Sequence, residues 1–364
     1  YFIKFKAKML NFWKNKNVFV TGHTGFKGAW LTKLLLMAGS FVHGYSREPE
    51  TSPNLFNSIS LDSELASHTI GEINDQSKLS TAIDVAKPDI IFLLTAQQLV
   101  IPSYEEPLET WNTNVLGTLS LLEVMKSQKK PCVIVIITTD KVYRNQESDK
   151  PFTEFDSLGG HDPYSASKAS CEILAASFRN SYCQNGQSAS HLKIATARAG
   201  NVIGGGDWSK YRIVPDIVRA YSNNHLLKIR NPNSIRPWQH VLESVYGYLC
   251  LAEKLTVSDD LIYQTAFNFG PDPSDKLSVS DLVSIASKTW NIKFQLDAQT
   301  TSKLEANSLL IDSNKANELL NWRSVWNSTQ AITQTLNWYH AFYQKVNTIH
   351  LIEGQIKNYL KGKQ

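Results

Sequence analysis

The feature that most constrains the fold is a strand, turn and helix pattern over residues 18–38. It begins with an apolar run typical of a buried β-strand, continues through Gly22, Gly25 and Gly28, and ends in a helical pattern. Glycines let a chain turn tightly and bring bare backbone against a diphosphate, whose charge is met by unpaired N–H groups at the helix start. The pattern predicts a dinucleotide-binding turn. Its spacing, Gly-x-x-Gly-x-x-Gly, differs from the commonest fingerprint, and a glycine-rich surface turn is the alternative.

Strand and helix patterns alternate over the first half of the chain. We predict further strands at 40–45, 68–73, 88–94 and 132–138, and helices at 75–86 and 110–126. The strand at 88–94 is continuously apolar, as expected where helices cover both faces of a parallel sheet. The alternation predicts an α/β fold, a Rossmann-type doubly wound parallel sheet, over residues 11–198.

The pattern of the chain changes from about residue 199. A glycine-rich loop is followed by shorter elements, with helices expected at 278–290, 314–320 and 329–343. Their apolar residues recur at spacings of three and four, which suits helices that cover a site and its core. We therefore predict a smaller, mainly substrate-binding α/β part over 199–345. The basic tail, 346–364, is expected to be a frayed helix or disordered.

The end of the second predicted strand carries Arg47 and Glu48 side by side. In dinucleotide sites an acid at this position binds the 2′-hydroxyl of the adenosine ribose, whereas an arginine accommodates a 2′-phosphate. Because both residue types are present, residue type does not decide between NAD and NADP. A solvated charge pair is the alternative.

Ionisable side chains gather where the strand at 132–138 ends, in Thr139, Asp140 and Lys141. The carboxyl ends of buried parallel strands are where α/β sheets hold their ligands, although a plain loop or a loop-shaping ion pair are alternatives. Tyr164 and Lys168 follow, four residues apart, which places both on one face of a helix. A nearby cation favours the phenolate and lowers the tyrosine pKa from ~10, so the pair can transfer protons near neutral pH.

A second ligand is indicated in the C-terminal part. Arg230 and Arg236 lie beside prolines and aromatic residues. Arginine forks suit phosphate oxygens and tryptophan faces suit base stacking, so a nucleotide diphosphate fits this region. Structural arginines at a seam between two parts of the fold are the alternative.

Together these motifs resemble one family. They are Thr21-Gly-His-Thr-Gly-Phe-Lys-Gly28, Thr139-Asp-Lys141, Gly159-Gly-His-Asp-Pro-Tyr-Ser-Ala-Ser-Lys168, Arg198-Ala-Gly-Asn-Val-Ile-Gly-Gly-Gly-Asp-Trp208 and Arg236-Pro-Trp-Gln-His240. The chain resembles the extended short-chain dehydrogenase/reductases from about residue 11 to 343, and within them most resembles the CDP-glucose 4,6-dehydratases. Where that group usually has His-Leu-Ala-Ala-Gln and then two basic residues, this chain has Leu93-Leu-Thr-Ala-Gln97 and Ile101-Pro102.

The resemblance implies a reaction on a nucleotide sugar, with CDP-glucose as the expected substrate and NAD as the cofactor. Bound NAD oxidises C4 of the glucose, water is lost across C5 and C6, and the hydride returns to C6. Tyr164 would take the 4-hydroxyl proton, assisted by Lys168, while Thr139 bonds the 4-oxygen. Asp140 would be the acid at the C6 hydroxyl. Lys141 would be the base at C5, which requires a pKa well below ~10.4, or an electrostatic stabiliser.

The resemblance also implies two sets of binding residues, and no metal is expected because no metal-ligand spacing is visible in the sequence. The expected cofactor contacts are Gly22, Thr24, Gly25, Phe26, Lys27, Gly28, Glu72, Ile73, Thr95, Ala96, Gln97, Tyr164 and Lys168. The expected substrate contacts are Asn201, Asp207, Trp208, Arg219, Arg230, Arg236, Gln239 and His240.

Composition narrows the remaining function classes. The net charge of +4 is small and the basic residues are scattered, which argues against nucleic acid. No apolar run approaches the ~20 residues of a membrane span, and the four widely spaced cysteines suit reduced thiols, so we expect a cytoplasmic protein. A homodimer through Leu116, Leu119, Leu122 and Ile173 is expected from the resemblance, and packing of these residues on the sheet is the alternative. A 4-epimerase, a decarboxylase or a non-catalytic nucleotide-binding protein are the alternative functions.

Overall fold

Seven parallel strands form the central sheet, in the order β11-β6-β5-β4-β1-β2-β3. This computed structural model describes residues 11–145, 150–229, 231–290, 292–296 and 309–362. The strands of the sheet are β1 (Asn17–Thr21), β2 (Phe41–Ser46), β3 (Ser67–Ile70), β4 (Ile90–Leu93), β5 (Cys132–Ile137), β6 (Leu192–Arg198) and β11 (Ala266–Asn268). The order reverses between β1 and β4, which leaves a crevice for a ligand at the carboxyl ends of the strands.

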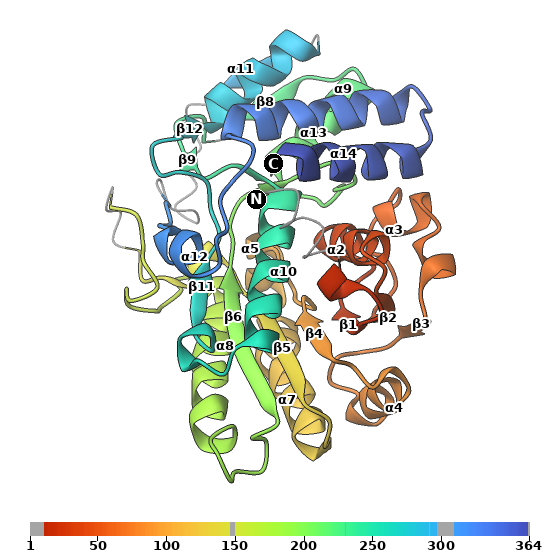
Figure 1. Cartoon of the computed structure of the whole chain (residues 1–364). Coiled ribbons are helices and arrows are strands. Elements are labelled where there is room, and N and C mark those ends of the chain that lie inside the picture. Colours follow the sequence, from red (N-terminus) through yellow and green to blue (C-terminus); the bar gives the residue numbers. More distant parts are fainter. Residues whose placement is uncertain (1–10, 146–149, 230, 291, 297–308, 363–364) are drawn as a thin grey trace.

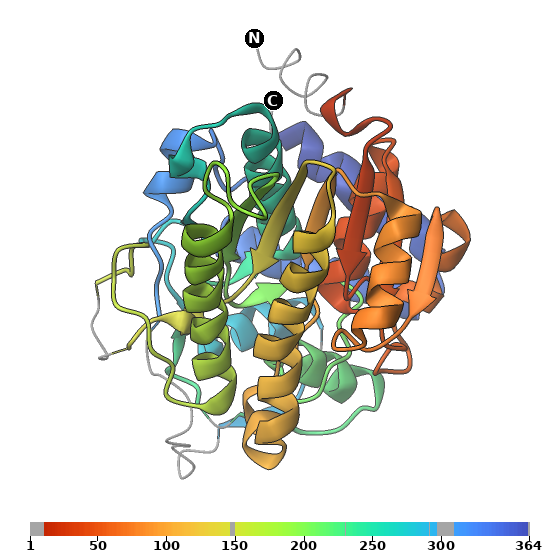
Figure 2. The same cartoon turned by 90° about the horizontal axis from the view of Figure 1, so that it is seen from below.

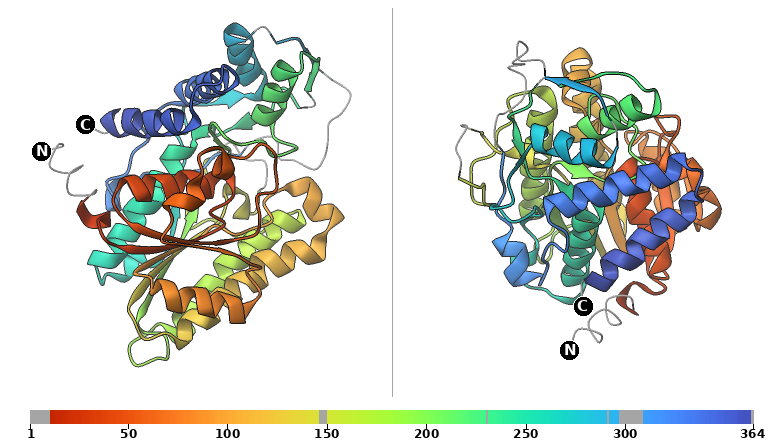
Figure 3. Two further views of the ribbon diagram at one scale, coloured as in Figure 1. Left: turned by 90° about the vertical axis from the view of Figure 1, so that its right-hand side faces the viewer. Right: turned by 90° about the horizontal axis from the view of Figure 1, so that it is seen from above.

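Helices cover both faces of this sheet (Figure 1). One face packs against α2 (Phe26–Met37) and α10 (Val241–Val257), and the other against α4 (Gln76–Ala86), α7 (Gly117–Ser127) and α8 (Pro163–Tyr182). Figure 2 shows α4, α7 and α8 in front of the strands, and Figure 3 shows the sheet between the two helix layers.

The strand sequences explain this double covering. In β5, Val133 and Val135 belong to the core under α2 and α10, whereas Ile134 and Ile136 belong to the core under α7 and α8. Successive side chains of a strand point to opposite faces, so a continuously apolar strand feeds two cores at once. The predicted doubly wound α/β fold is confirmed.

Three helical segments differ from the prediction. The helix expected at 110–126 is built from α6 (Pro107–Trp111), a π-helical turn (Asn112–Leu116) and α7. An additional short helix, α5 (Val100–Glu105), precedes them, and α3 (Leu55–Ser58) follows β2. These short segments lack the several turns over which apolar periodicity identifies a helix.

The chain after residue 199 builds a smaller part above the α2 side of the sheet (Figure 3, left). Its elements are β7 (Val202–Ile203), α9 (Ile213–Ser222), β8 (Leu227–Ile229), β9 (Ile235–Arg236), β10 (Gln239–His240), β12 (Leu277–Ser278), α11 (Val279–Thr289), β13 (Phe294–Leu296), α12 (Asn314–Leu319) and α13 (Ser328–Tyr343). Within this stretch α10 and β11 return to the large sheet, where β11 pairs with β6. The division at residue 198 stays a prediction.

The C-terminal tail is an ordered helix, α14 (Thr348–Gly362), and the expectation of a frayed or disordered end is wrong. Ile352, Ile356 and Tyr359 recur at spacings of four and three and are fully buried. These residues belong to the same core as α2 and α10. Their burial offsets the conformational entropy lost when the segment is ordered as a helix. In the part of the chain that the structure describes, no helix combines the length and apolar character needed to cross a membrane.

Candidate active site

Two cavities open at the carboxyl ends of the strands. The first, here called the cofactor cavity, lies against the glycine turn, and the second, the substrate cavity, lies against the end of β5 and the start of the smaller part. Both are lined by Phe26, Lys27, Gln98, Thr138, Tyr164 and Asp207. A ligand in one cavity can therefore meet a ligand in the other beside Tyr164.

The glycines of the turn are required by its geometry. Gly22 has a φ of +73°, and a Cβ atom there would lie 3.0 Å from the backbone nitrogen of Thr95. A Cβ on Gly28 would lie 2.0 Å from the carbonyl oxygen of Gly22. No side chain caps the start of α2 at Gly25, so the helix N-terminus faces the cavity ready for an anion.

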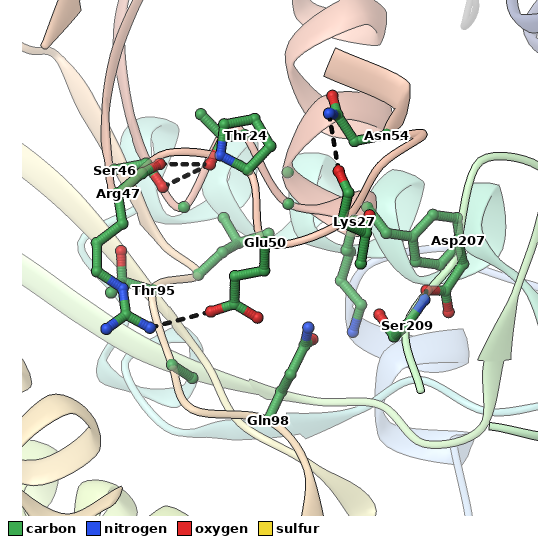
Figure 4. A pocket seen from close by; sticks show the side chains of 18 of the residues that line it. Thr24, Lys27, Ser46, Arg47, Glu50, Asn54, Thr95, Gln98, Asp207 and Ser209 are labelled. Carbon is green, nitrogen blue, oxygen red and sulfur yellow. Dashed lines mark hydrogen bonds and ion pairs between the residues drawn. The ribbon is translucent and has the colours of Figure 1, made fainter. Parts of the chain in front are cut away.

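Arg47 lines the cofactor cavity and forms ion pairs, of which Figure 4 shows the one with Glu50. Its guanidinium donates to Glu50 at 3.0 Å and to Glu109 at 3.1 Å. The Thr24 hydroxyl shares a hydrogen bond with the Ser46 hydroxyl and bonds the Arg47 carbonyl oxygen, each at 2.8 Å. Arg47 is thus already engaged by two carboxylates.

The residues predicted to be catalytic lie close together: Thr139, Asp140, Lys141 and Tyr164 line the substrate cavity, and Lys168 lines the cofactor cavity. The Thr139 hydroxyl donates to Asp140 Oδ1 at 2.9 Å and also hydrogen-bonds the Tyr164 hydroxyl. Lys168 Nζ donates to the carbonyl oxygen of Ile137 at 2.8 Å. The structure therefore brings together the residues of the two motifs, which are 23 or more positions apart in the chain.

Burial governs the proton affinities of this group. The Tyr164 pKa is raised to about 12, because removal from water outweighs the Thr139 hydrogen bond and the Arg212 cation. The sequence led us to expect Lys168 to lower this pKa, but here burial outweighs any cationic effect. Burial also raises the pKa of Asp140, against the pull of the Lys141 cation and the Thr139 hydrogen bond. A carboxyl group that holds its proton more tightly suits the role of an acid.

The backbone leaves little room around Asp140. A Cβ atom added at Gly200 would lie 1.7 Å from Asp140 Oδ2, and Asn201 Nδ2 donates to the same oxygen at 3.4 Å. Lys141 is half-buried and lines the substrate cavity. The Asp140 carboxyl is therefore held between the end of β5 and the loop at 199–208.

A buried ion pair that sequence reasoning missed lies beneath these residues. Glu172 is one helical turn beyond Lys168 on α8, and it accepts from Arg198 Nε at 2.9 Å and from the hydroxyls of Thr138 and Thr196. Arg198 also donates to the hydroxyl of Tyr143 at 2.8 Å. The signal was the spacing of four that Tyr164, Lys168 and Glu172 share. The pair thus bonds the end of β5, next to Thr139, Asp140 and Lys141, to α8 and β6.

Most of the expected cofactor contacts line the cofactor cavity. They are Gly22, Thr24, Gly25, Phe26, Lys27, Gly28, Thr95, Ala96, Tyr164 and Lys168. Three others do not line it. The Gln97 side chain bonds Leu99 and Thr110, Ile73 packs against Gly117, and the Glu72 carbonyl accepts from Tyr45. In Figure 4 the neighbouring Gln98 points into the cavity instead.

The expected substrate contacts divide in the same way. Asn201, Asp207 and Arg236 line the substrate cavity, and Trp208 lines the cofactor cavity. Arg230 lies outside the described residues. Sequence reasoning missed Arg212, which lines the substrate cavity and donates to Asp207 at 2.8 Å.

Three expected substrate contacts instead make contacts within the protein. Arg219 donates to the carbonyl of Trp208 and forms an ion pair with Asp216. Gln239 donates to the carbonyls of Gly200 and Phe269. His240 caps α10, lies edge-on to Trp30 and Trp326, and has a pKa lowered by burial to about 3. Their contact with substrate stays a prediction.

Comparison with known proteins gives the family. The family model described as GDP-mannose 4,6 dehydratase matches residues 19–335. The chain belongs to this family. It is also 41% identical, over 97% of its own length and 98% of the relative's, to CDP-glucose 4,6-dehydratase of Salmonella typhimurium. The resemblance to extended short-chain dehydrogenase/reductases of the dehydratase type is confirmed.

Solved structures support the fold of this family member. An epimerase from Methanothermobacter thermautotrophicus superimposes with a TM-score of 0.79 at 22% identity, covering 93% of this chain and 96% of the epimerase. A dTDP-glucose 4,6-dehydratase from Bacillus anthracis, solved in complex with NAD, has a TM-score of 0.73 at 22% identity, covering 90% and 97%.

Proposed function

We propose that the protein is an NAD-dependent nucleotide-sugar 4,6-dehydratase that converts CDP-glucose to CDP-4-keto-6-deoxyglucose with loss of water. The observation that carries the proposal is the placement of Asp140 and Lys141 beside Tyr164, where the two cavities adjoin. A 4-epimerase needs the unit that oxidises C4 but no acid for the C6 hydroxyl. The 41% identical relative, a CDP-glucose 4,6-dehydratase, supports the choice of sugar nucleotide.

The residues of this chain divide the work of oxidation. NAD, when bound, supplies a hydride acceptor that later returns the hydride. Tyr164 takes the proton of the 4-hydroxyl, and Thr139 holds the 4-oxygen through its hydroxyl. Lys168 lies one helical turn from Tyr164, where its cation favours the phenolate during the transfer.

Elimination follows because a ketone at C4 acidifies the proton at C5. Lys141 removes this proton as a base or stabilises the charge that develops. Asp140 gives its proton to the departing C6 hydroxyl, and the raised pKa of its carboxyl favours the protonated form needed for that step. A well-placed acid or base contributes roughly 10²- to 10⁴-fold in rate.

The ribose end of the cofactor cavity favours NAD over NADP. Arg47 is bound to Glu50 and Glu109, so a 2′-phosphate would have to displace both carboxylates. Glu48 and Glu50 also line the cavity, and their charges repel a phosphate while a carboxylate accepts a hydrogen bond from a 2′-hydroxyl.

The assembly state belongs to the same proposal. Leu108, Trp111, Leu116 and Ile173 are large apolar residues exposed on α6, the π-helical turn and α8, and we assign this face to a homodimer contact. Leu122, which the sequence placed in the same contact, is fully buried against the sheet. We also propose a cytoplasmic location, from the widely spaced cysteines and the lack of a ~20-residue apolar run in the sequence.

The test is the product mass. The purified protein is incubated with CDP-glucose, and separately with dTDP-, GDP- and UDP-glucose, with and without added NAD. We expect CDP-glucose alone to lose one water, with no net NADH. An unchanged mass with an altered sugar configuration identifies an epimerase, and no change with any substrate identifies a binding protein.

A variant separates the two half-reactions. Asp140→Asn keeps the side-chain shape and removes the transferable proton, so bound NAD should still be reduced transiently while water loss falls roughly 10²-fold or more. Absorbance at the NADH band and product mass report the two steps. Dehydration at the wild-type rate would exclude Asp140 as the acid.

A further inference from the structure

Lys27 occupies the point where the two cavities meet. It lies in the first turn of α2, within the glycine turn, and lines both cavities. Figure 4 shows its side chain directed past Asp207 and Ser209 into the cofactor cavity. Its Nζ donates to the Tyr248 hydroxyl of α10 at 3.2 Å and lies 5.6 Å from the centre of that ring.

No ion pair is recorded for Lys27 anywhere in the described ranges. The neighbouring charged groups are already engaged: Arg212 is paired with Asp207, Lys168 bonds a backbone carbonyl, and Asp140 accepts from Thr139. A cation removed from water with no anion beside it is costly, and further cations increase the cost. The site therefore lacks an anionic partner.

The pKa of Lys27 reflects the lack of an anionic partner. Its pKa is lowered to about 7, first by removal from water and then by Arg212 and Lys168, with a smaller opposing effect of Asp140. The other titratable groups around it are Tyr164 of α8, whose pKa burial raises to about 12, and Tyr248 of α10, whose pKa burial also raises. Lys27 is thus poised to change charge near neutral pH.

We propose that Lys27 is a phosphate-binding residue for the dinucleotide, and that the dinucleotide binds together with a proton taken up by the Lys27 amine. The glycine turn places bare backbone and an uncapped helix start beside this side chain, so one diphosphate can contact all three. The inference rests on the proposed function only in taking NAD as the ligand. It requires nothing of the sugar chemistry.

The sign of the pH effect follows from linkage. An anion beside Lys27 raises its pKa above 7, so the ammonium form is the one that binds. The NAD association constant should be level below pH 7 and fall about tenfold per pH unit above it, up to the pKa in the complex. Isothermal titration calorimetry from pH 6.5 to 9, in two buffers of different ionisation enthalpy, measures the affinity and the proton uptake together.

Three variants isolate the effect. Lys27→Met should bind NAD roughly 10- to 100-fold more weakly at pH 7 and lose the pH slope. Lys27→Arg keeps a permanent charge and should bind NAD without the slope. The matched control is Lys228→Met, because Lys228 lines the substrate cavity but not the cofactor cavity. This variant should retain both the wild-type NAD affinity and its pH dependence. Circular dichroism confirms that each variant is folded.

The outcomes are distinct. Retention of the slope in Lys27→Met, or an NAD affinity equal to wild type at pH 7, overturns the proposal. Titration with CDP alone distinguishes the phosphates of NAD from those of the sugar nucleotide. If the CDP association constant depends on pH through Lys27 and the NAD association constant does not, Lys27 binds the substrate instead. Failure to dehydrate CDP-glucose leaves these NAD measurements unaffected, so the proposed function and this inference can fail separately.

Discussion

Neutralising Glu172 tests whether the buried ion pair beneath the catalytic strand end stabilises the fold. In Glu172→Gln the side chain keeps its size, but Arg198 loses its anionic partner while both remain about 4% exposed. Thr138, Thr196 and Arg198 all donate hydrogen bonds to the Glu172 carboxylate. The glutamine amide replaces one accepting oxygen by an NH₂ group, which is itself a donor and cannot accept these bonds. Breaking a buried pair by removing one partner costs about 3–5 kcal/mol, which we expect as the loss in unfolding free energy.

Urea-induced unfolding followed by circular dichroism at pH 7 measures this loss. The matched control is Glu123→Gln, the same substitution in a surface pair with Lys126, for which about 0–1 kcal/mol is expected. Glu172→Leu combined with Arg198→Met should cost less than the two single changes together, because no unpaired charge remains. If Glu172→Gln lowers the unfolding free energy by less than about 1 kcal/mol, the buried Glu172–Arg198 ion pair does not stabilise the fold as argued.

The same variant should differ from the wild type in its response to acid. Arg198 and the donors around Glu172 lower the pKa of its carboxyl despite burial. The ionised form therefore contributes stability at neutral pH, and this contribution disappears as the pH falls through the lowered pKa. We expect the difference between wild type and Glu172→Gln to shrink on acidification, and a constant difference down to pH 3 or below would contradict it.

Two further substitutions test the site and the C-terminal helix. Gly200→Ala places a Cβ atom 1.7 Å from Asp140 Oδ2, so the Asp140 carboxyl must move. The kcat for dehydration should fall roughly 10²-fold with NAD affinity unchanged. A kcat within about threefold of wild type in steady-state assays would contradict this. Tyr359→Phe removes a 2.7 Å hydrogen bond to buried Glu243 and should lower the unfolding free energy by about 1.5–3 kcal/mol, measured by urea titration, whereas no change would show that the bond makes no net contribution.

Continuous apolar runs and glycine spacing were enough to predict the central sheet. Strands such as β4 and β5 supply both cores, so their sequence carries a strong and unbroken signal. The spacing of Tyr164 and Lys168 likewise defined one face of α8. These features depend on local sequence. The structure confirms the sheet and brings the predicted catalytic residues Thr139, Asp140, Lys141 and Tyr164 to one cavity.

Features that depend on tertiary packing were not predictable in this way. Gln97 and Gln98 are adjacent in sequence, yet only the path of the chain after β4 decides that Gln98 lines the cavity. The Tyr164 pKa depends on how much protein surrounds the ring, which spacing alone does not reveal. The basic composition of the tail hid the apolar face of α14, whose Glu353 forms an ion pair with buried Lys33 of α2 at 3.1 Å.

The return of α10 and β11 to the sheet has a consequence for how the protein folds. The described part of residues 11–198 holds six strands of the sheet, in which β6 pairs with β5 on one edge and packs against α8 on one face. Its other edge is paired, and its other face covered, only when the chain comes back with β11 and α10. Contacts between residues far apart in sequence form slowly because the intervening loop must close first. A fragment that stops at residue 198 would leave an open strand edge at β6, so self-association is its expected behaviour. The cofactor half therefore reaches its final packing only after most of the substrate half has been made.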